Sequence, residues 1–186
     1  MKFYIVLLMA AALVLLIKPM RFIVKRLILI IKLKKLCRKS NAKLYLTHPF
    51  SLFSGIHGKN CNLYIETQYE IMSVKLFGLG DKPYYITFMP DRRYTVTRFF
   101  IVPGARGVFN QPIVSKEKNI PRYRFDYKFK SEWNFKTFRK ILLINPVSMD
   151  HKVRNKSSWK YLCNGDFLYD IETYSYNGLK RIIEKE

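Results

Sequence analysis

The chain has 186 residues, of which 34 are lysine or arginine and 13 are aspartate or glutamate, giving a net charge of +21 at pH 7. This length allows one ordinary domain beside a membrane anchor, and the charge favours phosphate-rich or acidic partners. The 3 cysteines are far apart and the 3 histidines are scattered, which argues against a disulfide scaffold or a zinc site. We therefore expect free thiols in a reducing compartment, with no metal and no cofactor.

Residues 3–17 form an uncharged apolar run that predicts a transmembrane anchor over residues 1–19. A helix of this length covers about 22 Å, which is short for a hydrocarbon core of ~30 Å unless Lys18 snorkels to the headgroups. A cleaved signal peptide is one alternative, but the small residues 10–12 lie inside the run rather than after it. A second span over residues 22–33 is another, but three basic residues interrupt it. We predict a single retained span.

Residues 20–39 predict a basic amphipathic stem helix. Nine basic residues and no acidic residue lie between positions 18 and 39, which by the positive-inside rule places the N-terminus outside and the following domain in the cytoplasm. Such a helix suits an anionic headgroup layer, although its charges also serve simply as the topology signal. The apolar residues Met20, Ile23, Leu27, Ile30 and Ile31 are predicted to face away from the basic side. The candidate anion-binding residues of this region are Lys18, Arg21, Lys25, Arg26, Lys32 and Lys35. Cys37, beside the stem, is a candidate for acylation, with a buried thiol as the favoured alternative.

Residues 40–186 predict a single β-rich domain that is itself basic, because only ten of the basic residues precede it. Its first half predicts strands at residues 43–47, 62–67, 70–77, 84–89 and 93–102. The last two are separated by a Pro90-Asp91 turn and should form a hairpin. Residues 103–121 are irregular, and a loop of this length is often a lid or a binding element.

Residues 122–130 show the clearest alternation in the chain. The aromatic residues Tyr123, Phe125, Tyr127 and Phe129 alternate with charged residues, which predicts a strand with an aromatic core face and a basic outer face. The basic residues of that face are also candidate membrane-contacting or anion-binding residues: Arg122, Arg124, Lys128 and Lys130. The alternative is a solvated edge that discourages aggregation.

The remaining chain predicts a short helix over 131–140, with Ser131 as its cap and Trp133, Phe135 and Phe138 inward. A buried strand at 141–144 follows, then a hairpin of 159–163 with 167–174, and a final helix at 178–184 capped by Ser175 or Asn177. The predicted fold class is α+β. It consists of an N-terminal transmembrane helix and basic stem helix, followed by a mostly antiparallel β domain with one or two short helices.

No motif in the sequence defines an enzyme. The candidate titratable residues are Asp91, Asp150, His151, Asp166, Asp170 and Glu172, and their spacing predicts no paired acid–base site. We favour a non-enzymatic, single-pass membrane protein whose basic cytoplasmic domain binds anionic lipid headgroups or an acidic partner in a membrane complex. Two alternatives stay open: a membrane-tethered, hydrolase-type enzyme for phosphate-containing substrates, and a nucleic-acid-binding domain. One continuous basic plane formed by the stem and residues 122–130 would favour the membrane, whereas a cleft would favour a ligand.

Overall fold

The computed structural model describes residues 23–53, 57–78, 84–101, 110–145, 150–155 and 158–185. The predicted transmembrane anchor lies outside these residues, and no helix within them has the length and apolar character needed to cross a bilayer. A helix over residues 23–39 is followed by the elements listed here. They are β1 (Lys43–Leu46), η1 (Pro49–Phe53), β2 (Leu63–Glu66), β3 (Glu70–Phe77), β4 (Tyr84–Phe88), β5 (Arg93–Ile101), β6 (Asn110–Val114), β7 (Lys118–Asn119), η2 (Ser131–Trp133), β8 (Thr137–Ile144), β9 (Asp150–Asn155), β10 (Ser158–Tyr161), β11 (Phe167–Leu168), β12 (Ile171–Ser175) and α2 (Tyr176–Ile183).

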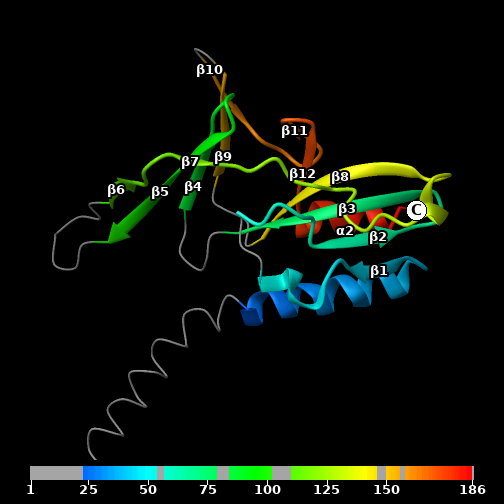
Figure 1. The fold of residues 1–186 in the computed structure, drawn as a ribbon. Helices are drawn as coiled ribbons and strands as arrows, with labels where there is room; N and C mark the ends of the chain where they lie inside the picture. The colour runs from blue at the N-terminus through cyan, green and yellow to red at the C-terminus, as the bar shows by residue number, and fades with distance from the viewer. Residues whose placement is uncertain are drawn as a thin grey trace, which may run out of the picture.

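The strands form two sheets (Figure 1). The larger sheet has the order β1-β2-β3-β8-β12-β11, and the smaller has the order β10-β9-β4-β5-β6 with β7 also paired to β5. The α+β class is confirmed, but the larger sheet is mixed, because β8 runs parallel to both β3 and β12. Parallel neighbours need a long crossover connection, and here the connections are the strands of the smaller sheet. This pairing of distant strands is not visible in local sequence patterns.

The helix over residues 23–39 and α2 cover one face of the larger sheet (Figure 1). Inward residues of the first helix recur every three or four positions, as an amphipathic helix requires: Leu29, Ile30, Leu33, Leu36 and Cys37. They pack in one cluster with alternate residues of β2, β3 and β8 and with Leu179 and Ile183 of α2. The predicted stem helix is therefore confirmed as a helix, and it belongs to the core of the domain that follows it.

The opposite face of the larger sheet is covered by the smaller sheet and by the segment 120–133. Phe77 of β3 contacts the rings of Phe88 and Tyr94 from the smaller sheet. The carbonyl oxygen of Phe125 accepts hydrogen bonds from the Tyr64 hydroxyl at 3.0 Å and from the Ser73 hydroxyl at 2.6 Å. Buried side chains of the segment, including Ile120, Phe125 and Trp133, join the second core cluster.

The predicted strand over residues 122–130 is wrong. The segment has a single bridge, between Arg124 and Asn60, and it turns at Lys128, whose φ is 61°. The predicted sides nevertheless hold, because the four aromatic residues are buried or half-buried and the charged residues between them are exposed. Alternating burial requires only an extended chain on an apolar surface, not a ladder of backbone hydrogen bonds.

The β4–β5 hairpin and the strands at β1, β2 and β3 are confirmed. The predicted helix over 131–140 is wrong: η2 covers three residues, β8 begins at Thr137, and Phe135 is 97% exposed rather than inward. The loop predicted over 103–121 contains β6 and β7 among its described residues. A 3₁₀ helix such as η2 seldom extends beyond one turn, and β8 then begins at Thr137, a β-branched residue that favours a strand. These preferences outweigh the helical spacing of the aromatic residues.

The predicted hairpin of 159–163 with 167–174 is also wrong. β10 pairs with β9 of the smaller sheet, whereas residues 167–175 fold back on themselves as β11 and β12. The two residues of that tight turn, Tyr169 and Asp170, have φ of 56° and 85°. A turn of this kind favours glycine or asparagine. Because Tyr169 and Asp170 stand at its two positions instead, the sequence does not predict the turn. The predicted final helix is confirmed as α2, and its cap is Ser175, whose hydroxyl accepts from the Gly178 N–H at 3.1 Å.

Candidate functional site

The helix over residues 23–39 carries a second apolar stripe on the side away from the sheet. This stripe is formed by Val24, Leu27, Ile28 and Ile31, and Ile31 is 65% exposed. All four lie in the first half of the helix, next to the predicted transmembrane anchor in the sequence. We call this exposed side, together with its cations, the outer helix face. Contiguous exposed apolar residues commonly mark a surface that contacts a membrane or another protein.

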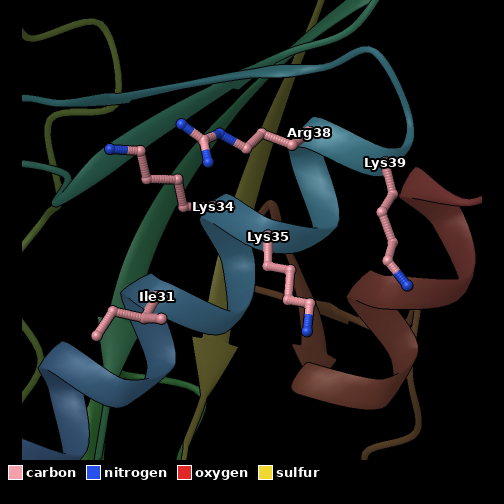
Figure 2. Close-up of a pocket in the computed structure, with 5 residues that line it drawn as sticks. All are labelled: Ile31, Lys34, Lys35, Arg38 and Lys39. Carbon is pink, nitrogen blue, oxygen red and sulfur yellow. The ribbon is translucent and has the colours of Figure 1, made fainter.

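Basic residues flank the apolar stripe. The outer helix face has six exposed cations: Lys25, Lys32, Lys34, Lys35, Arg38 and Lys39. Residues seven apart share a side of a helix, so Lys25, Lys32 and Lys39 form one row along it. Lys34 and Arg38 lie on the opposite side of the outer helix face from this row. Figure 2 shows their side chains pointing away from α2, whereas the side chains of Lys35 and Lys39 lie on the side of the helix nearer to α2. Ile31 and the last four of these cations border a hollow of about 530 Å³.

Of the predicted anion-binding residues in the stem, Lys25, Lys32 and Lys35 lie on this face, whereas Lys18 and Arg21 lie outside the described residues. Arg26 is only 4% exposed and lies on the sheet-facing side of the helix. Burial lowers the pKa of its guanidinium to about 10. Ile30, predicted with Leu27 and Ile31 to face away from the basic side, is buried in the core, whereas Leu27 and Ile31 are exposed. In the sequence, the spacing of Leu29, Leu33 and Leu36 is the signal that could have identified the apolar side facing the sheet.

The cations of residues 122–130 do not extend the outer helix face. Arg122, Arg124, Lys128 and Lys130 are exposed, but their segment covers the opposite face of the larger sheet. The Lys130 ammonium lies 4.4 Å from the ring centroid of Tyr45 and 5.5 Å from that of Trp133, so it also packs on the aromatic core. The two basic groups therefore do not form one continuous plane. Residues 122–130 do not line the hollow beside Ile31.

A second, smaller hollow lies between the first helix and the carboxyl ends of β8 and β12. Its volume is about 230 Å³, and it is lined by Lys25, Ile28, Leu29, Lys32, Asn145 and Tyr176. Asn145 and Tyr176 directly follow the paired ends of β8 and β12, Ile144 and Ser175. Sequence reasoning missed both residues, because nothing in the sequence indicated that these two strands are parallel neighbours.

The candidate carboxylates whose side chains the structure describes are held in separate ion pairs rather than gathered in one acid–base site. Asp91 contacts Arg93, Asp166 contacts Lys160, and Asp170 contacts Lys140 at 3.2 Å. The Glu172 carboxylate is bound by Arg139, which lowers the pKa of that carboxyl. Within the described residues, no three His, Cys, Asp or Glu side chains gather to hold a metal ion. The side chains of Asp150 and His151 lie outside the description.

A cluster of polar groups is buried beneath the segment 120–133. The Lys75 side chain lies under the ring of Tyr123, with the ammonium 5.1 Å from its centroid, and donates to the carbonyl oxygen of Asn60 at 2.9 Å. Burial, with a smaller contribution from the charge of Arg26, lowers the pKa of Lys75 to about 8. Burial also raises the pKa of Cys61 nearby. These groups fasten the segment to the sheet.

The cysteine thiols divide into two kinds. Cys37 is 2% exposed within the core of the helix-covered face, and burial raises its pKa to about 11. An acyl chain on this thiol could not reach a membrane without opening the core, so the structure favours the buried-thiol interpretation. Cys163 is exposed.

Comparison with known proteins found no match to this chain among protein-family models, curated proteins or solved structures. The functional interpretation therefore depends on the geometry of the chain itself.

Proposed function

We propose that this chain is a non-enzymatic, single-pass membrane protein whose outer helix face contacts anionic lipid headgroups on the cytoplasmic side. The observation that carries the proposal is that the helix over residues 23–39 is apolar on two sides. One side is in the protein core, and the other exposes four apolar residues, with Lys25 and Lys32 along one margin and further cations from Lys34 to Lys39 beyond the end of the stripe. An apolar stripe flanked by cations is the pattern of a helix that lies in a membrane interface.

The magnitudes favour a stable contact. Complete burial of one large aliphatic side chain contributes about 1.5–3 kcal/mol, and the four side chains of the stripe are already roughly half buried. Their further burial would contribute a few kcal/mol together. Each basic residue near an anionic surface adds about 1 kcal/mol, which falls as salt is raised. A predicted anchor immediately before the helix would remove most of the remaining cost of association, because it keeps the helix beside the bilayer.

The position of residues 122–130 refines the proposal. These cations are separated from the outer helix face by the larger sheet, so we assign lipid contact to the helix alone. The cations of residues 122–130 would then face away from the bilayer, where an acidic protein of the same membrane complex could bind them. Nucleic acid would be attracted to the same charges, and a steep loss of binding with salt is expected for either partner.

The test places environment-sensitive probes on the outer helix face of the full chain, reconstituted in vesicles. Ile28→Cys and Ile31→Cys are each labelled in a Cys163→Ser background, which leaves only buried cysteines besides the label. Val114→Cys, on the smaller sheet and 59% exposed, is the matched control. We expect brominated lipids to quench the probes at 28 and 31 but not at 114, and more strongly when the vesicles contain phosphatidylserine. Equal quenching at all three positions, or none, would show that the helix does not contact lipid.

A further inference from the structure

We propose that the hollow lined by Lys25, Lys32, Asn145 and Tyr176 is a binding site for a single phosphate group, either free or as the monoester headgroup of a lipid. The lipid version depends on the function proposed above, whereas phosphate binding itself does not. The hollow shares only Ile28 with the apolar stripe and otherwise lies toward α2 and the strand ends.

The position of the hollow in the fold supports a ligand site. In sheets with parallel strands, ligands commonly bind beyond the carboxyl ends of neighbouring strands, where the connecting segments diverge. Here β8 and β12 are parallel neighbours, and the chain leaves them at Asn145 and Tyr176. The helix over residues 23–39 covers this end and closes one side of the space.

The lining residues supply the chemistry that a phosphate requires. Lys25 and Lys32 are separated by about 10.5 Å along the helix axis, so their flexible side chains approach the hollow from two directions. Asn145 and Tyr176 offer an amide and a phenol as further donors, and no carboxylate lies among the described lining residues. Two cations and two neutral donors match an anion with several acceptor oxygens better than they match a carboxylate.

Two further features add to this arrangement. α2 begins at Tyr176, so the positive end of its helix dipole lies beside the hollow, although its Gly178 N–H is already bonded to Ser175. Ile28 and Leu29 form an apolar part of the lining. Because Ile28 also belongs to the exposed stripe, a lipid phosphate in the hollow would have its acyl chains adjacent to apolar side chains.

The experiment titrates the full chain, in a neutral detergent, with inorganic phosphate and separately with dihexanoyl phosphatidic acid, using isothermal calorimetry. Lys32→Gln and Tyr176→Phe alter the hollow at exposed or half-exposed positions, so the fold should survive both. Lys34→Gln removes the same charge from the same helix outside this hollow, and Tyr161→Phe removes an exposed phenol elsewhere. Loss of a hydrogen bond to a charged group should weaken phosphate binding roughly tenfold or more for Lys32→Gln, and less for Tyr176→Phe.

The proposal is supported if these two variants weaken saturable binding and their controls do not. Tighter binding of phosphatidic acid than of phosphate, lost in the same variants, would identify a lipid headgroup as the ligand, whereas equal binding of both would identify the phosphate alone. No saturable binding of either probe, or the same loss in Lys34→Gln as in Lys32→Gln, would overturn it. Neither result depends on vesicle contact by the apolar stripe, so this site and the proposed membrane surface can fail separately.

Discussion

Replacing Leu33 by alanine should destabilise the whole domain, because the helix that carries it is part of the core. Leu33 is completely buried, between the helix and the larger sheet. The substitution removes three carbon atoms, which corresponds to about 2.4 kcal/mol of lost transfer free energy at ~0.8 kcal/mol per methylene group. The unfilled cavity adds to this, and comparable leucine truncations cost about 2.7–5.0 kcal/mol. We therefore expect a loss of roughly 2.5–5 kcal/mol in the free energy of unfolding.

Ile31→Ala is the matched control on the same helix. The Ile31 side chain is 65% exposed, so its truncation to alanine should lower the free energy of unfolding by less than about 1 kcal/mol. Ile31→Ala should instead weaken the contact with anionic vesicles, which Leu33→Ala should leave intact under folding conditions. The two substitutions thus separate the inner side of the helix from its outer face.

The assay is urea unfolding of the full chain in neutral detergent, followed by Trp133 fluorescence in a Trp159→Phe background. Trp133 is buried on the opposite face of the sheet, against Tyr45, Tyr64 and Phe129, so it reports the helix substitution only if the domain unfolds cooperatively. Equal midpoints for Leu33→Ala and Ile31→Ala would refute the reasoning, since a stem outside the core would tolerate both changes.

Three further outcomes are expected from buried or partly buried charged residues and from one exposed thiol. Arg139→Gln leaves the carboxylates of Glu70 and Glu172 without their shared cation, so unfolding at pH 7 should cost about 3–5 kcal/mol less than in the wild type. That difference should shrink in acid, because the lowered pKa of Glu172 means its stabilisation is lost as pH falls through the folded pKa; a pH-independent difference in urea midpoints would contradict this. Burial lowers the pKa of Lys75 to about 8 from 10.5, so the folded chain releases that proton first and stability should rise with pH between these values. Lys75→Met should remove this contribution, and identical pH profiles for both proteins would exclude it. Finally, an impermeant maleimide should label Cys163 in cells only after permeabilisation, while the two buried cysteines react only on unfolding; labelling of intact cells would reverse the proposed orientation.

The sequence was sufficient for features that depend on local patterns. The 23–39 helix, the hairpin of β4 and β5 and the Ser175 cap follow from spacing, turn residues and a capping side chain within a few positions of one another. Features that depend on pairing between strands far apart in the sequence could not be predicted. The parallel pairing of β8 with β3 and β12 joins strands separated by the whole smaller sheet, and no local signal specifies it.

The candidate site divides in the same way. Charge and position alone predict Lys25, Lys32 and Lys35, which are exposed, whereas Arg26, predicted with them, is buried. Asn145 and Tyr176 are ordinary residues in the sequence and gain interest only because two strand ends lie side by side.

The helix over residues 23–39 has a consequence for how the domain is mounted. Only residues 40–42 separate it from β1, and the Ala42 N–H bonds back to the Cys37 carbonyl at 2.8 Å. Because the helix is packed into the core and joined to β1 by three residues, it cannot turn independently of the domain. If the helix contacts a bilayer as proposed, its orientation therefore also fixes the height and tilt of the whole domain. A fragment beginning at residue 40 would lack one of the two helices that cover the sheet, so a soluble version of the domain should retain the helix from residue 23.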